Sequence, residues 1–161
     1  MEIEMKIRAL MMDPVTNVPI VILKGSDGNT LLPIWVGVYE ANAIALEIEK
    51  VATQRPMTHD LLRNILQGLG CSVSKVVVNQ LKDDTFYAII WLMQDGNLIS
   101  VDSRPSDALA LALRTDSPIY VDEEVIKGSK ATSSKQEKLN DDELKRWLEN
   151  LGDEDLGKYK M

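Results

Sequence analysis

The sequence predicts an α/β fold of the α+β type, with a mixed, largely antiparallel sheet, two to three packed helices and a short C-terminal helical tail. Three observations support this prediction. Apolar and charged residues alternate from Ile3 to Ala9, which is typical of a half-buried strand. Turn sequences at residues 26–29 and at Asp95 separate apolar segments, as they do in antiparallel hairpins. The Ala/Leu run at residues 108–113 lies between two strand-like segments, which indicates a crossover helix.

The first half of the chain contains three predicted strands and one predicted helix. After the strand at residues 3–9, residues 18–25 and 30–37 form two further strands joined by an SDGN turn. Pro33 lacks a backbone N–H, so it indicates a sheet edge or the end of regular pairing. From residue 39 to residue 51 the apolar residues recur at helical spacing. The predicted buried face of this helix consists of Ala41, Ile44, Ala45, Ile48 and Val51.

A second helix is predicted from Thr58 to Leu69. Thr58 has a side chain suited to an N-cap, and Gly70 is suited to ending the helix. Residues 74–81 and 84–93 then form two strands. The second of these strands is apolar on both faces, which predicts a central position covered on each side.

A strand at residues 97–102, the Ala/Leu helix and a strand at residues 118–122 complete the predicted body. The composition then becomes polar. We therefore expect a domain over residues 1–127, a flexible linker over residues 128–139 and an acidic tail over residues 140–161. The apolar face of a short helix in this tail consists of Leu144, Trp147, Leu148 and Leu151.

The 161 residues have a formal net charge of -7. This charge argues against broad, non-specific nucleic-acid binding, which depends on a surplus of Lys and Arg. It leaves open a local basic site, or a metal that bridges carboxylates to phosphate. Cys71 is the only cysteine, which excludes an intrachain disulfide and a cysteine-based zinc site. The N-terminus lacks a signal-peptide core and no apolar stretch could span a membrane, so we expect a soluble, cytoplasmic protein.

Two predicted helices begin with the same kinds of residue. The segment from Arg104 to Asp107 reads RPSD, and the segment from Arg55 to Asp60 reads RPMTHD. A helix start has unpaired N–H groups and a partial positive charge, which explains the proline, the hydroxyl and the aspartate. It does not explain the arginines, which oppose this dipole. Each arginine therefore needs a partner, either an internal carboxylate such as Asp102 or an external anion such as phosphate.

Two further side chains near these helix starts each have a structural and a functional interpretation. His59, the only histidine, is either an exposed first-turn residue or a general base or metal ligand. Glu40 either compensates the dipole of its own helix or joins Asp60, Asp102 or Asp107 around a hard divalent cation.

Four segments, in this order along the chain, resemble the bifunctional nuclease domain family: LPIWVGVYEANAIALEIE, RPMTHDLL, DTFYAII and VDSRPSDALALALRTDSPIYV. The resemblance extends from the first strand to about Val125. It implies a compact α/β domain that self-associates and acts on both DNA and RNA. The polar positions that recur in the family correspond here to Glu40, Arg55, His59, Asp60, Asp102, Arg104, Ser106 and Asp107.

The resemblance leads to the hypothesis of a nuclease that hydrolyses phosphodiester bonds of DNA and RNA with the help of Mg²⁺ or Mn²⁺. The predicted catalytic residues are His59, Asp60 and Asp107. The predicted substrate-binding residues are Arg55, Arg104 and Ser106. The predicted metal ligands are Glu40, Asp102 and Asp107.

A second hypothesis assigns the same charged residues to a non-catalytic module. In that case they bind a phosphate-bearing ligand such as a nucleotide, or they stabilise the fold as a salt-bridge network. The acidity of the chain favours this alternative, because a nuclease must attract a polyanion. A homo-oligomer, most simply a dimer, is expected in both cases, because the apolar edge at residues 33–38 and the tail helix could bury surface.

Overall fold

The computed structural model describes residues 1–129, 132–133 and 146 of the chain. The strands are β1 (Glu2–Met12), β2 (Pro19–Gly25), β3 (Thr30–Trp35), β4 (Ser72–Lys82), β5 (Thr85–Gln94), β6 (Asn97–Ser103), β7 (Ile119–Asp122) and β8 (Thr132–Ser133). The helices in this part of the chain are α1 (Val38–Ile48), α2 (Thr58–Gly68), α3 (Pro105–Thr115) and α4 (Glu123–Gly128).

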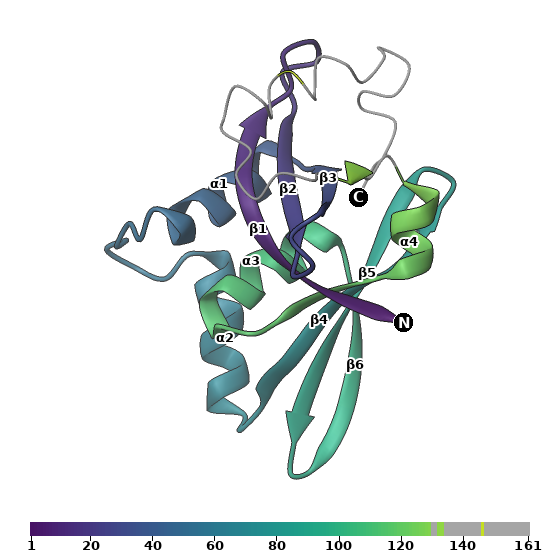
Figure 1. Cartoon of the computed structure of the whole chain (residues 1–161). Helices are drawn as coiled ribbons and strands as arrows, with labels where there is room; N and C mark the ends of the chain where they lie inside the picture. The colour runs from purple at the N-terminus through teal and green to yellow at the C-terminus, as the bar shows by residue number, and fades with distance from the viewer. Residues whose placement is uncertain (130–131, 134–145, 147–161) are drawn as a thin grey trace.

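The strands form one mixed sheet in the order β6-β5-β4-β7-β1-β2-β3-β8 (Figure 1). Neighbouring strands are antiparallel except for β4 and β7, which are parallel. A parallel pair requires a crossover connection, and α3 leads into β7 as the sequence indicated. The predicted α+β class with a largely antiparallel sheet is therefore confirmed.

Helices α1, α2 and α3 lie together beside the sheet, whereas α4 lies apart from them, next to β4 (Figure 1). The hydrophobic core includes Ile22, Ile34, Ile44, Phe86 and Leu109, each at most 1% exposed. The Ala/Leu helix α3 is buried along most of its length, because it lies between the sheet and the other two helices. Its N-terminus is thereby fixed next to the N-terminus of α2.

The predicted turns have the required backbone geometry. Asp95 and Gly96 have φ values of 50° and 79°, which close a two-residue hairpin between β5 and β6. Gly28 has a φ of 79° between β2 and β3. Pro33 lies opposite Ile22 of β2, and among the described residues β8 pairs with β3 only before Pro33 is reached. Residues 130–131, which come next in this register, lie outside the described part of the chain, so an end of regular pairing at Pro33 stays a prediction.

Two local predictions were wrong. The helix α1 ends at Ile48, and Lys50 leaves the helical conformation with a φ of 55°, so Ile48 and Val51 are about half exposed instead of buried. Thr58 is the first residue of α2 and Met57 is the N-cap. The carboxylate of Asp60, not the hydroxyl of Thr58, accepts the Met57 N–H at 3.0 Å.

The strand β5 is also less central than its apolar sequence suggested. It lies next to the edge strand β6, and its residues alternate between buried and more exposed positions. Phe86, Ala88, Ile90 and Leu92 are buried, whereas Tyr87 on the opposite face is 39% exposed. The helices thus cover one face of this strand only.

The short helix α4 was not predicted, because its six residues are too few to show a period. The predicted linker and tail helix lie almost entirely outside the described residues, so they and the domain boundaries stay predictions. No helix among the described residues is long and apolar enough to cross a membrane.

Candidate active site

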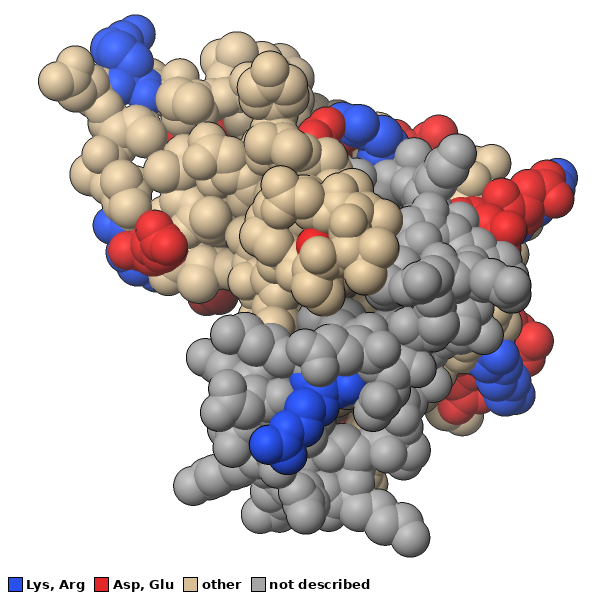
Figure 2. Space-filling model, turned by 90° about the horizontal axis from the view of Figure 1, so that it is seen from above, with Lys and Arg blue, Asp and Glu red and all other residues tan. Residues whose placement is uncertain are grey.

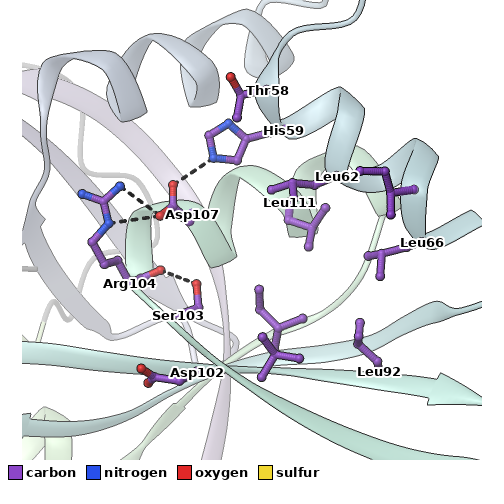
Figure 3. A pocket seen from close by; sticks show the side chains of 13 residues that line it. Thr58, His59, Leu62, Leu66, Leu92, Asp102, Ser103, Arg104, Asp107 and Leu111 are labelled. Carbon is purple, nitrogen blue, oxygen red and sulfur yellow. Dashed lines mark hydrogen bonds and ion pairs between the residues drawn. The ribbon is translucent and has the colours of Figure 1, made fainter.

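The N-termini of α2 and α3 bring the only histidine next to an aspartate. His59 Nε2 lies 2.9 Å from Asp107 Oδ1 (Figure 3). The His59 side chain is 9% exposed and the Asp107 side chain 31% exposed. An ionised carboxylate can only accept a hydrogen bond, so Nε2 is the protonated nitrogen and Nδ1 is left as the acceptor of a neutral ring. This arrangement orients the imidazole and fixes its tautomer.

Arg104, the N-cap of α3, extends this pair into a chain of four side chains. Its Nη2 lies 2.8 Å from Glu40 Oε1 and 3.0 Å from Asp107 Oδ2, and its Nε donates to the same Asp107 oxygen at 3.1 Å. Hydrogen bonds to Asp107, then to Glu40, raise the pKa of the guanidinium above its usual value. We call Glu40, His59, Arg104 and Asp107 the polar cluster. The partner of Arg104 is therefore internal, but it is not Asp102, the carboxylate named from the sequence.

The polar cluster lies where two hollows meet. The larger hollow, of about 490 Å³, lies between α2 and the β5–β6 hairpin. Its walls are mostly apolar and include Leu62, Leu66, Leu92 and Leu111 (Figure 3). The second hollow, of about 310 Å³, reaches along α1 from Glu40 to Leu46. Both hollows are lined by Thr58, His59, Arg104 and Asp107.

Asp60 accepts a hydrogen bond at its helix start, as the sequence predicted, and forms an ion pair that the sequence did not predict. Its Oδ1 accepts from Arg114 Nε at 2.8 Å, and its Oδ2 accepts the Met57 N–H. The Met57 N–H, followed by Arg114, lowers the pKa of the Asp60 carboxyl, although burial opposes this effect. Since both oxygens are occupied away from His59, the geometry gives Asp60 a positioning role: it fixes the start of α2.

Arg114 was missed by the sequence analysis. Its side chain is 2% exposed and also donates to the Ala110 carbonyl at 2.8 Å and to the Ala43 carbonyl at 2.9 Å. It thus joins α1, α2 and α3 behind the polar cluster. A signal was present, because an arginine in an otherwise apolar, buried helix must be paired. The identity of the partner depends on how three helices pack.

Besides Asp60, three predicted site residues lie outside the polar cluster. Asp102 is exposed and its side chain points away from Asp107 (Figure 3). Ser106 is fully buried, and its hydroxyl has no hydrogen-bond partner among the described residues. Arg55 is exposed, lines neither hollow and makes no ion pair with the part of the chain that the structure describes.

The predicted metal ligands, Glu40, Asp102 and Asp107, stay a prediction. Within residues 1–129, 132–133 and 146, no three His, Cys, Asp or Glu side chains are grouped so that they could hold a metal ion. Glu40 and Asp107 both contact the Arg104 guanidinium, whereas Asp102, which lines the larger hollow, makes no ion pair with the described residues. On the face in Figure 2, the described Lys and Arg side chains form small separate groups.

The fold and the site define a small α+β domain with a histidine, two carboxylates and an arginine joined at the ends of three helices. The chain belongs to the bifunctional nuclease domain family, whose family model matches residues 21–134. The matched range contains the whole polar cluster.

Relatives of this chain support the same assignment. An uncharacterized protein of Mycobacterium tuberculosis is 43% identical over 123 residues, which cover 76% of this chain and 73% of that protein. Bifunctional nuclease 1 of Arabidopsis thaliana is 31% identical over 107 residues, which cover 64% of this chain and 33% of the plant protein. Bifunctional nuclease 1 of Oryza sativa subsp. japonica is 28% identical over 109 residues, 65% of this chain and 33% of the rice protein. The chain therefore spans about a third of the plant nucleases that it matches.

Proposed function

We propose that the protein is a nuclease that hydrolyses phosphodiester bonds of DNA and RNA at the polar cluster. The observation that supports this most strongly is the 2.9 Å contact between His59 and Asp107, with Arg104 beside it, where two hollows meet. Family membership and the names of the plant relatives point to the same class of reaction.

Each side chain of the cluster has a role in this proposal. Asp107 holds the His59 ring through Nε2, so Nδ1 is free to take a proton from the attacking water. Arg104 stabilises the charge that develops on the phosphate. Its Nε and Nη2 are occupied by Asp107 and Glu40, but its Nη1 makes no hydrogen bond to the described residues and its side chain is 52% exposed. Nη1 is thus the donor available to a phosphate oxygen.

The two hollows suit a chain-like substrate. A strand laid across Thr58 and Arg104 places one nucleotide in the apolar hollow and its neighbour along α1. Apolar side chains such as Leu62 and Leu92 can pack against the faces of an unpaired base. Local contacts of this kind also suit a protein of net charge -7, which lacks the charge for broad attraction of nucleic acid.

Assistance by Mg²⁺ or Mn²⁺ stays part of the proposal as a prediction to be tested. Three of the four carboxylate oxygens of the polar cluster, namely Glu40 Oε1 and both oxygens of Asp107, already contact the guanidinium or the imidazole, so we assign no step to a metal. Protein dialysed against EDTA, then supplied with Mg²⁺, Mn²⁺ or neither, will show whether cleavage depends on the ion.

The proposal is tested by cleavage of defined single-stranded DNA and RNA by wild type, His59→Ala and Asp107→Asn. Loss of a general base or of its orienting carboxylate reduces the rate by about 10²- to 10⁴-fold. Asp116→Asn is the matched control, because Asp116 is exposed at the far end of α3 in a left-handed conformation that asparagine also adopts. Cleavage of equal rate by all four purified proteins would show that the activity lies elsewhere.

One observation favours the non-catalytic alternative. The four side chains of the polar cluster form hydrogen bonds and ion pairs with one another at 2.8–3.1 Å, as the members of a structural network do. If this is their whole role, His59→Ala and Asp107→Asn lower the unfolding midpoint, and wild-type protein cleaves neither DNA nor RNA under any metal condition.

A further inference from the structure

We propose that the edge strand β6 pairs with β6 of a second copy of this chain, so that two sheets join into one across a two-fold axis. The strand β6 is the end of the sheet, with β5 on one side and no strand on the other among the described residues. Six of its seven residues are exposed. Leu98, Ile99 and Val101 are 58%, 40% and 40% exposed, although they are large and apolar.

This edge has none of the features that normally keep exposed strands apart. It contains no Lys and no Pro, its pairing with β5 has no bulge, and its only charged residue is Asp102. Soluble proteins usually protect such edges with charge, proline or irregular geometry. An unprotected, apolar edge is therefore expected to be covered by another strand. The segment at residues 33–38, where the sequence analysis placed self-association, is a poorer candidate, because Ile34, Trp35 and Val36 are already buried.

The hairpin turn determines which backbone groups of β6 are available. A two-residue loop at Asp95 and Gly96 is flanked by a hydrogen-bonded pair, here Gln94 and Asn97. Hydrogen-bonded and non-hydrogen-bonded pairs alternate along antiparallel strands, and the register of β5 and β6 is unbroken. The N–H and C=O groups of Leu98, Ser100 and Asp102 consequently point outward, away from β5.

These outward N–H and C=O groups can hydrogen-bond to the same groups of a second, antiparallel β6 when the two-fold axis passes beside Ser100. Ser100 then faces the partner's Ser100, and Leu98 faces the partner's Asp102, all in hydrogen-bonded pairs. Ile99 faces the partner's Val101 in the non-hydrogen-bonded pair, where opposite side chains are closest. The two Asp102 residues are four residue steps apart, about 14 Å, which exceeds the screening length of about 8 Å at physiological salt. The strand is thus self-complementary, which favours a second copy over an unrelated strand.

The pairing would also place the second copy beside the candidate active site. Val101 lines the larger hollow together with Leu62 and Ile65 of α2, which are 41% and 48% exposed. The partner's Ile99, packed against Val101, adds to this wall of the hollow. The dimer therefore accounts for exposed apolar side chains on both β6 and α2. It does not depend on whether the protein is a nuclease.

The first test is the mass of the full chain in solution, by light scattering or sedimentation equilibrium. A single chain of 18.0 kDa predicts twice that mass for the dimer. Ile99→Lys introduces a charge opposite the partner's Val101, so we expect this variant to have the single-chain mass. Ile99 is partly exposed in one chain, so its thermal unfolding monitored by circular dichroism should remain cooperative. A single-chain mass for wild type at micromolar concentration overturns the proposal, and so does a dimer that Ile99→Lys leaves intact.

The second test measures the register with cysteines in a Cys71→Ser background. Ser100→Cys places two cysteines opposite each other, with Cα atoms about 5.5 Å apart, within the range of a disulfide. We expect this variant to form a covalent dimer under mild oxidation. Leu98→Cys is the matched control, because it is equally accessible but its copies lie about 14 Å apart in this register. Equal crosslinking of both variants, or crosslinking of Leu98→Cys alone, contradicts the proposed pairing.

Discussion

Replacement of Arg114 by leucine tests whether the three helices are fixed from behind the polar cluster. The change removes hydrogen bonds of 2.8, 2.8 and 2.9 Å to Asp60, Ala110 and Ala43. Removing one member of a buried ion pair costs about 3–5 kcal/mol. The Asp60 side chain is 17% exposed, and in the variant it can still accept the Met57 N–H. Partial hydration therefore places the expected loss of unfolding free energy at the lower end of this range, about 3 kcal/mol. Such a loss is a large fraction of the stability of a domain of this size.

Urea unfolding followed by circular dichroism measures this effect. With a slope of about 1.5 kcal/mol per molar urea, a loss of 3 kcal/mol shifts the midpoint by about 2 M. The double variant Asp60→Leu/Arg114→Leu should be more stable than Arg114→Leu, because it leaves no unpaired carboxylate. A loss below about 1 kcal/mol for Arg114→Leu would mean that the pair behaves like a surface ion pair and does not fix the three helices.

Two further predictions concern Gly37 and Asp60. Gly37→Ala should weaken the contact between Glu40 and Arg104, because an added Cβ would collide with the Glu40 carboxylate. A crystal structure of the variant should show this carboxylate displaced from Arg104. A Glu40 carboxylate in its original position would contradict the prediction. The pKa of Asp60 is lowered from 3.8, so its ionised form stabilises the fold above that pH, and this contribution is lost as the pH falls through the folded-state pKa. Asp60→Asn should therefore be less stable at neutral pH but lose less of its stability on acidification, whereas equal acid dependence of both proteins would exclude Asp60 as a contributor.

Much of the fold could be predicted because local signals and tertiary packing agree. The alternation in β1, the Asp-Gly turns and the Ala/Leu helix each indicate one structure, and the parallel pairing of β4 and β7 follows from the crossover through α3. The prediction for β5 was wrong because an apolar strand next to an edge has the same sequence pattern as a central one. What covers its second face is decided by elements distant in sequence.

Part of the candidate site could also be predicted from local sequence signals. Arg-Pro helix starts identified His59, Arg104 and Asp107, which the structure brings together, since a helix N-terminus demands particular residue types locally. The sequence could not assign partners. Arg104 contacts Asp107 and Glu40 rather than Asp102, which makes no ion pair with the described residues. Ser106 precedes Asp107 at the same helix start, but its side chain faces the core and not the polar cluster.

In the proposed mechanism, the N-termini of α2 and α3 form one catalytic unit. The most direct measurement is a double-mutant cycle on kcat/KM for cleavage of single-stranded DNA, with His59→Ala, Asp107→Asn and the combined variant. Since Asp107 acts by orienting His59, we predict that the combined variant is no slower than His59→Ala alone. Rate losses that multiply in the combined variant would contradict this account, because they would show that His59 and Asp107 contribute independently.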